Sequence, residues 1–122
     1  MIDPGTYNNV IKSGSTWVLQ FQVQDLVDGL WVPLDLAGYS ARCQLRPNPF
    51  SNDFILNATC VVTTSTGTVN CSLSPALTST IPQWVNQLDY DVELFTLNDG
   101  DVFSPVEGFM TVIPNVTVPV AQ

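Results

Sequence analysis

The sequence predicts an all-β protein, built as one antiparallel sandwich of about seven or eight short strands. Apolar and polar residues alternate with period two in segment after segment, and clusters of Gly, Pro, Asn and Asp separate these segments, a pattern typical of an all-β sandwich or barrel. A chain of 122 residues suits one domain with its own core. We expect residues 1–122 to form this single domain, with an extended N-terminal arm at 1–7 and an extended tail at 116–122.

The first half of the chain contains two well-marked strands and a hairpin. In residues 16–24, Trp17, Leu19, Phe21 and Val23 share one face, and threonine, valine and glutamine side chains occupy the other. The following Asp28-Gly29 pair is a strong hairpin signal. In residues 39–46, Tyr39, Ala41, Cys43 and Leu45 share a face that lies opposite Ser40, Arg42, Gln44 and Arg46.

The second half continues the same pattern. Residues 54–62 and 69–73 are expected to form two strands joined by a turn, and residues 88–96 form another whose outer face carries carboxylates. Residues 74–84 have few strand features and are the best candidate for one short helical turn. Residues 102–114 are expected to form a final strand pair or one kinked strand.

Charge and composition exclude several classes of partner. Three basic residues against eleven acidic ones give a net charge of −8, so the chain cannot present the basic face that nucleic acid or anionic lipid requires. No signal peptide is visible at the N-terminus, and no apolar run approaches the roughly 20 residues that span a bilayer. We therefore expect a soluble protein made in a cytosol. Charged residues make up only 11% of the chain, which favours a surface covered by other subunits.

The residues that catalysis or metal binding would need are missing or badly placed. The chain has no histidine, the usual general base for a serine or cysteine nucleophile, and its three cysteines lack zinc-motif spacing. All three cysteines lie in the apolar phase of their strands and are expected to act as small core residues. The alternative is a disulfide between Cys60 and Cys71, which would face each other if the chain turns at Ser65-Thr66. We predict no enzyme activity, no cofactor and no metal.

A ladder of opposite charges is predicted between two strands. Asp89, Asp91 and Glu93 lie on one face of one strand, and Arg42 and Arg46 would alternate with them if the two strands are neighbours. Paired carboxylates can hydrolyse glycosides, but such pairs usually come from different strands that line a cleft. We therefore interpret these residues as a structural ladder or a solvated strand face.

Four aromatic residues in or beside loops are candidate interface residues. They could cap the ends of the sandwich or anchor a partner, and a carbohydrate-binding module could use them as a stacking platform. Among them, the residue favoured as a partner anchor is Trp84. The four are Trp31, Phe50, Trp84 and Phe103. The nearby Asn98-Asp99-Gly100 segment has oxygens that could suit calcium, but it lacks EF-hand spacing and is interpreted as a hairpin turn.

Four segments taken together resemble a family of small tailed-phage virion proteins. The segments are PGTYNNVIKSGSTWVLQFQVQD, VPLDLAGYSARCQLR, ALTSTIP and YDVELFTLNDGDVFSPVEGFMTVIPNVT. They contain a G-x-T-aromatic strand, a DL-x-GY-x-A-x-x-x-x-R segment, a YD-x-EL strand and a glycine before the closing strand. The order is similar to that in the N-terminal domain of phage baseplate upper proteins, which dock receptor-binding proteins onto the tail.

The resemblance implies an immunoglobulin-like sandwich with a structural or docking role in a virion, made in the cytoplasm of the bacterial host. It implies a tail, baseplate or fibre-attachment protein that contacts other virion proteins and forms a homo-oligomer, with the arm and the tail as straps onto adjacent chains. The alternatives are a capsid decoration (cement) protein and a carbohydrate-binding module.

Overall fold

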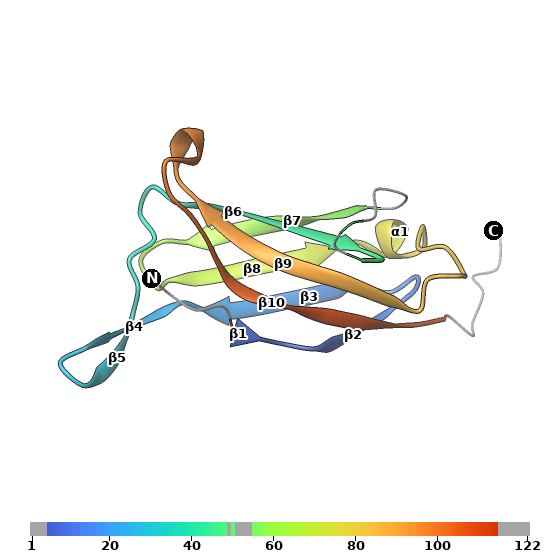
Figure 1. Ribbon diagram of the computed structural model, residues 1–122, viewed down its shortest axis with the longest axis horizontal. Helices are drawn as coiled ribbons and strands as arrows, with labels where there is room; N and C mark the ends of the chain where they lie inside the picture. Colours follow the sequence, from blue (N-terminus) through green and yellow to red (C-terminus); the bar gives the residue numbers. More distant parts are fainter. Residues whose placement is uncertain (1–4, 49, 51–54, 115–122) are drawn as a thin grey trace.

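The computed structural model describes residues 5–48, 50 and 55–114, and these residues are almost entirely β-structure (Figure 1). The all-β class predicted from the alternation is therefore confirmed. The described residues form ten strands and two short helical segments. In chain order these are β1 (Gly5–Thr6), β2 (Asn9–Lys12), β3 (Trp17–Gln22), β4 (Gln24–Val27), β5 (Leu30–Pro33), β6 (Ser40–Arg46), β7 (Leu56–Thr63), β8 (Thr68–Leu73), α1 (Pro75–Thr78), β9 (Gln87–Phe95), η1 (Leu97–Asp99) and β10 (Val102–Ile113).

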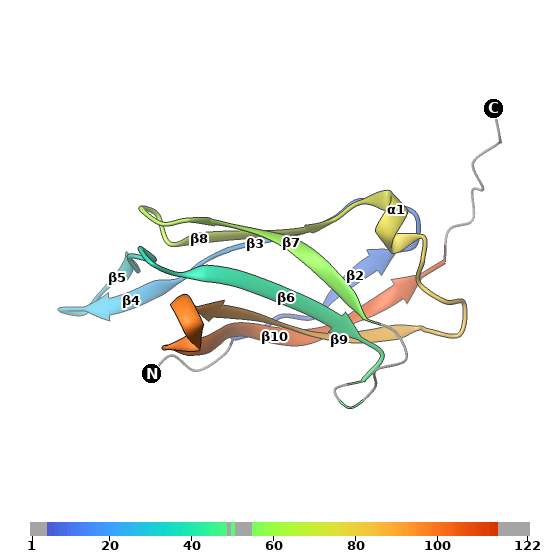
Figure 2. The same cartoon turned by 90° about the horizontal axis from the view of Figure 1, so that it is seen from above.

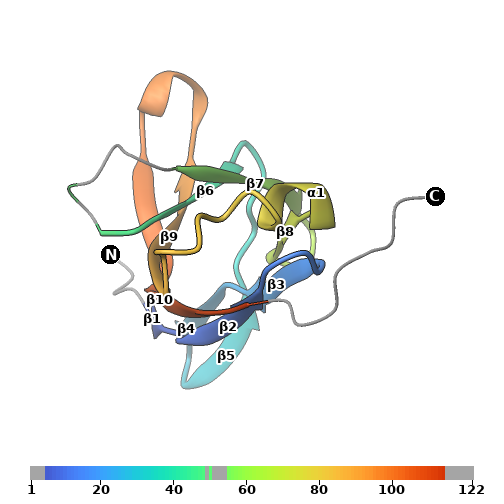
Figure 3. The same ribbon diagram turned by 90° about the vertical axis from the view of Figure 1, so that its right-hand side faces the viewer.

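Eight of these strands form one curved sheet in the order β1-β10-β9-β6-β7-β8-β3, with β2 also paired to β10. Strand β7 lets the sheet curl, because its first part, residues 56–58, pairs with β6 and its remainder, residues 59–63, pairs with β8. Figure 2 shows β7 and β8 lying over β9 and β10, and Figure 3 shows the same sheet from one end, curving round the core. The large sheet is therefore nearly barrel-shaped.

The core occupies the inside of this curve, and one side chain in two reaches it. Strand β9 shows the pattern most clearly: Leu88, Tyr90, Val92 and Leu94 are buried and alternate with more exposed residues. The three cysteines are in the expected phase, with Cys43 and Cys71 buried and Cys60 partly buried against the core. The other buried apolar residues are Ile11, Trp17, Leu19, Val23, Leu36, Leu45, Leu56, Val69, Leu73, Ile81, Val85 and Met110.

The N-terminal strands differ from the expectation of a purely antiparallel sheet. Both β1 and β2 run parallel to β10, so the sheet is mixed. Gly108 makes this close approach feasible, since a Cβ at this position would lie 2.2 Å from the carbonyl oxygen of Tyr7. That oxygen also accepts a hydrogen bond of 2.6 Å from the Tyr90 hydroxyl.

The arm expected at residues 1–7 therefore lies, over residues 5–7, on the protein's own sheet rather than reaching away from it. Local alternation did not indicate this docking, because the partner strand is about a hundred residues away. Residues 1–4 and the predicted tail 116–122 lie outside the described residues.

The hairpin predicted at Asp28-Gly29 is confirmed. Strands β4 and β5 pair antiparallel, and both turn residues have positive φ, at 51° and 80°, as a two-residue type I′ turn requires. This two-stranded sheet is separate from the large one and projects beyond its end at the lower left of Figure 1.

The expected helical turn is also present. Ser74 caps α1 by accepting a hydrogen bond from the Leu77 amide, and the buried hydroxyl of Thr78 lies 2.8 Å from the carbonyl oxygen of Ser15 in the β2–β3 connection. Residues 102–113 form one strand with an irregularity between Phe103 and Val106, which agrees with the kinked-strand alternative.

Candidate functional site

On the outer face of β6 and β9, polar side chains lie opposite each other in three rows that run across the strands. The antiparallel register places Arg42 opposite Glu93, Gln44 opposite Asp91, and Arg46 opposite Asp89. Two of these rows continue onto β10, where Glu107 lies opposite Asp91 and Phe109 lies opposite Asp89. Because successive side chains on a strand point to opposite faces, the same registers direct the intervening residues into the core.

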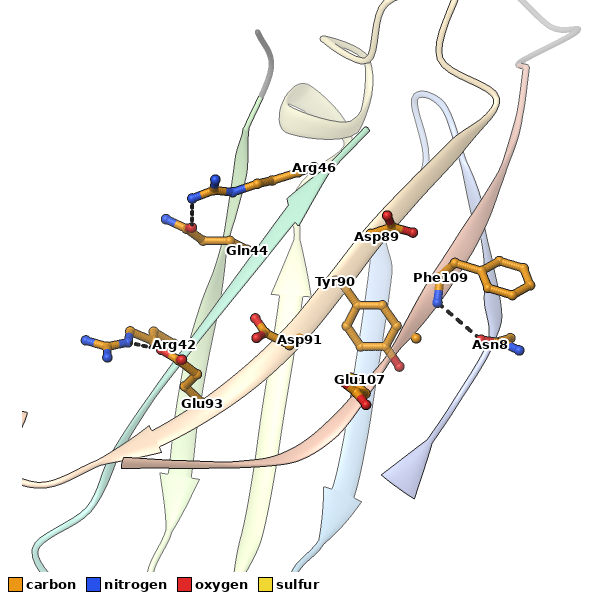
Figure 4. A pocket seen from close by; sticks show the side chains of 11 residues that line it. Asn8, Arg42, Gln44, Arg46, Asp89, Tyr90, Asp91, Glu93, Glu107 and Phe109 are labelled. Carbon is orange, nitrogen blue, oxygen red and sulfur yellow. Dashed lines mark hydrogen bonds and ion pairs between the residues drawn. The ribbon is translucent and has the colours of Figure 1, made fainter. Parts of the chain in front are cut away.

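These rows line a shallow concave depression of about 900 Å³, which we call the charged face (Figure 4). Asn8 closes one side, and its Oδ1 atom accepts a hydrogen bond of 3.2 Å from the Phe109 amide. The lining residues are Asn8, Arg42, Gln44, Arg46, Asp89, Tyr90, Asp91, Glu93, Glu107, Gly108 and Phe109.

The predicted charge ladder lies on this face. Arg42 Nε donates to Glu93 Oε1 at 2.6 Å, and the Arg42 guanidinium lies 4.4 Å from the centre of the Phe95 ring. Arg46 donates a hydrogen bond of 2.9 Å from its guanidinium to Gln44 Oε1. The face therefore holds its two arginines by a combination of ion pairing, ring contact and amide contact.

Asp91 is the least favourably placed charge of the face. Partial desolvation raises the pKa of its carboxyl group, and the neighbouring Glu93 and Glu107 raise it further, whereas Arg46 and Arg42 oppose the shift. Like charges directly opposite each other on paired strands are destabilising. The side chain remains exposed, so solvent screens these interactions.

The charged face offers hydrogen bonds and ion pairs to a polar partner. No group of three or more His, Cys, Asp or Glu side chains within residues 5–48, 50 and 55–114 is arranged to hold a metal ion. No helix in this part of the chain is long and apolar enough to cross a membrane.

The structure does not bring the four candidate interface aromatics together. Trp31 lies on β5 in the projecting hairpin, whereas Trp84 lies in the connection between α1 and β9. Figure 1 shows the hairpin and α1 at opposite ends of the molecule. Trp31 and Trp84 are each 65% exposed, and Phe50, in the connection between β6 and β7, is 93% exposed. Phe103 is half-buried and makes an edge-to-face contact with Tyr39, with ring centres 5.5 Å apart, so it packs against the protein's own core.

The β4–β5 hairpin carries a second candidate surface. Only Trp31 of this hairpin is predicted from the sequence as an interface residue, and the apolar residues beside it are missed. Leu26, Val27 and Leu30 are 55%, 45% and 68% exposed, and they adjoin the exposed Trp31. We call this set of four residues the apolar hairpin surface. The signal was present in the sequence, because the adjacent apolar pairs Leu26-Val27 and Leu30-Trp31 interrupt the alternation. A strand that is apolar on both faces cannot bury both of them in a two-stranded sheet.

The hairpin is firmly attached to the body at its base. The Leu34 amide donates to the Val23 carbonyl at 2.9 Å, and the Val23 amide donates to the Gly67 carbonyl at 2.7 Å. The apolar surface thus projects away from the core on a base that is hydrogen-bonded to the body.

Comparison with models of known protein families found no match, and neither did a search of curated proteins.

Proposed function

We propose that the protein is a non-enzymatic structural component of a bacteriophage virion. It acts in the tail, baseplate or fibre-attachment region, and it docks onto neighbouring virion proteins through the apolar hairpin surface. The observation that carries the proposal is this projecting hairpin, whose apolar side chains are exposed on a base that is hydrogen-bonded to the body. Exposed apolar patches on soluble proteins mark interaction sites, and buried tryptophans are frequent anchors of interfaces.

The charge of the hairpin indicates what kind of protein surface receives it. Asp25 and Asp28 are its ionisable residues, and it contains no basic residue. Two such hairpins docked on each other would bring like charges together, which disfavours contact between two copies through this surface. The complementary partner is therefore an apolar groove with a basic rim, supplied by a different virion protein.

The strand pairing supports an immunoglobulin-like sandwich as the finer description of the fold. The set β3-β8-β7 and the set β6-β9-β10 have the order of strands B-E-D and C-F-G in immunoglobulin domains. In this interpretation β7 bridges the two sets. Such a domain suits a docking module, because its loops and hairpins project from the two ends of a rigid body.

A capsid decoration protein would use the same docking chemistry, so the location on the particle separates the two roles. A carbohydrate-binding role has less support, because the exposed Trp31 and Trp84 lie on separate elements, the β4–β5 hairpin and the α1–β9 connection, and do not form one stacking platform.

The test is incorporation into particles of the phage that encodes the protein. Trp31→Ser removes the largest side chain of the hairpin surface, and Trp84→Ser is the matched control, because both tryptophans are equally exposed. We expect the unmodified protein and Trp84→Ser to be found in purified particles by immunoblot, and Trp31→Ser to be depleted at least about tenfold. Circular dichroism and Tm establish that both variants are folded.

Absence of the unmodified protein from purified particles would refute the virion role. Normal incorporation of Trp31→Ser would refute the hairpin as the docking surface. Gold-labelled antibody on capsid faces would reassign the protein to capsid decoration.

A further inference from the structure

Two cysteines lie directly opposite each other on neighbouring strands. Cys60 on β7 and Cys71 on β8 are register partners in an antiparallel pair, and their Sγ atoms are 3.3 Å apart. Both are free thiols. The turn between the two strands sets this register, so the pair is a built feature of the hairpin rather than a chance contact between flexible side chains.

The backbone already has the geometry that a disulfide requires. Directly opposed residues of antiparallel strands have Cα atoms about 4.5–5.5 Å apart, which lies within the range that disulfides span. The two sulfur atoms need only approach to about 2 Å, which is a side-chain adjustment. Neither strand has to move for the bond to form.

The two thiols differ in how an oxidant can reach them. Cys71 is fully buried, whereas Cys60 is partly exposed at the edge of the core. The third cysteine, Cys43, is buried on β6, where its register partners are Ala58 and Val92. Cys43 also contacts Cys71 closely enough to raise its pKa, but both of these thiols are buried. Cys60 is the register partner of Cys71 and is the accessible thiol, so access and register together favour the Cys60–Cys71 pair.

The surroundings keep these thiols protonated at neutral pH. A hydrogen bond with Cys43 and burial raise the pKa of Cys71 to about 12, although the hydrogen bond with Cys60 acts in the opposite direction. The hydrogen bond with Cys71 and burial raise the pKa of Cys60 as well. Because the thiolate is the reactive form, the pair is stable as thiols in a reducing compartment and reacts slowly at neutral pH.

We propose that Cys60 and Cys71 form a latent disulfide, which a low-molecular-weight disulfide such as oxidised glutathione closes in the folded protein. This inference rests on the geometry of the hairpin and is independent of the proposed virion role.

The reaction proceeds in two exchange steps. The Cys60 thiol loses its proton to solvent and attacks one sulfur of oxidised glutathione, so that a Cys60–glutathione bond forms and one glutathione leaves as a thiolate that takes up a proton. The deprotonated Cys71 then attacks the Cys60 sulfur and releases the second glutathione, which is protonated in turn. Two cysteine thiols are oxidised by two electrons, and one glutathione disulfide is reduced to two thiols.

The disulfide would cross-link β7 to β8 next to the point in β7 where the sheet bends. Strand β7 pairs with β6 at its start and with β8 over its remainder, so a link from β7 to β8 holds the strand that joins the two sides of the core. Cross-linking also restricts the unfolded chain. We therefore expect the oxidised protein to melt several degrees higher than the reduced protein.

The test treats the folded protein with oxidised glutathione at pH 7 and pH 9, and follows free thiols and intact mass. In the unmodified protein, we expect the three free thiols to fall to one, with loss of two hydrogen atoms and a Cys60–Cys71 link in the peptide map. The initial rate should rise roughly tenfold for each pH unit. Cys43→Ala should keep the reaction, whereas Cys60→Ala should abolish it while remaining folded.

Three results would overturn the proposal. These are thiols that stay unreacted at pH 9 in the folded protein, a bridge that involves Cys43, and a glutathione adduct at Cys60 that Cys71 does not displace. An unchanged Tm after oxidation would refute the stabilising role of the bond.

Discussion

The hairpins β4–β5 and β7–β8 are both antiparallel and both turn at a glycine with positive φ, yet their side chains are buried to very different extents. In β7–β8 the apolar residues alternate, so one face is buried against the core and the other faces solvent. In β4–β5 the apolar residues are adjacent, and nearly every side chain is exposed. In these two hairpins the spacing of the apolar residues, rather than their number, decides whether their side chains enter the core or stay exposed.

The largest expected effect comes from the two turn glycines. At Gly67 in β7–β8, a Cβ would lie 2.6 Å from the Leu34 carbonyl oxygen and 2.8 Å from that of Val23, whereas a Cβ at Gly29 in β4–β5 would meet nothing within 4 Å. We expect Gly67→Ala to lower the free energy of unfolding by about 4 kcal/mol and Gly29→Ala by about 1 kcal/mol, the latter through its positive φ alone. Urea unfolding of the two variants measures both values. Equal losses would contradict the different attachment of the two turns.

A smaller contrast is expected between two leucines. Leu73 on β8 is 1% exposed and Leu30 on β5 is 68% exposed. Leu73→Ala removes buried contacts and should cost about 3 kcal/mol, while Leu30→Ala should change the free energy of unfolding by less than about 0.5 kcal/mol. Thermal and denaturant unfolding give both numbers. A large loss for Leu30→Ala would mean that the projecting hairpin contributes to the core after all.

The smallest expected change in the free energy of unfolding is at Asp91 on β9, a strand whose outer face is charged rather than apolar. The pKa of Asp91 is raised by partial desolvation, Glu93 and Glu107, so the folded state holds this proton more tightly than the unfolded state does. The ionised carboxylate therefore costs stability above the folded-state pKa, and the cost disappears below the unfolded value of about 3.9. Asp91→Asn should raise the free energy of unfolding by about 0.5 kcal/mol at pH 7, after allowance for solvent screening.

The control for this change is the pH dependence of the same measurement. The stabilisation by Asp91→Asn should vanish near pH 3, where the aspartate is already protonated in both states. A gain that persists unchanged at pH 3 would assign the effect to packing instead of charge.

Much of the fold follows from local sequence. The alternation in residues 39–46 and 88–96 correctly assigns the buried faces of β6 and β9, and the Asp28-Gly29 pair marks its hairpin. The same alternation indicates which arginines and carboxylates share a face, and the register then places Arg42 beside Glu93. These features depend on neighbours in the sequence or on a face that alternation defines.

The remaining features depend on pairings that no local pattern encodes. The parallel docking of β1 and β2 on β10 has no connecting turn to mark it, and the concavity of the charged face arises only after three strands are assembled. The scatter of Trp31, Phe50 and Trp84 likewise follows from the connections between strands. The adjacent apolar pairs of β4–β5 can be recognised in the sequence. Their exposure follows because a strand that is apolar on both faces can bury only one of them in a two-stranded sheet.

The docking of the N-terminal strands also sets an order of events during synthesis. Residues 5–12 pair with residues 106–113, so during synthesis they stay unpaired at this edge until residues 106–113 have been made. Contacts between such distant segments form slowly, because the intervening loop must close first. The edge beside β10 is therefore the last part of the sheet to be completed. We expect nascent chains to be most open to mispairing at this edge, until the Tyr7 backbone packs against Gly108.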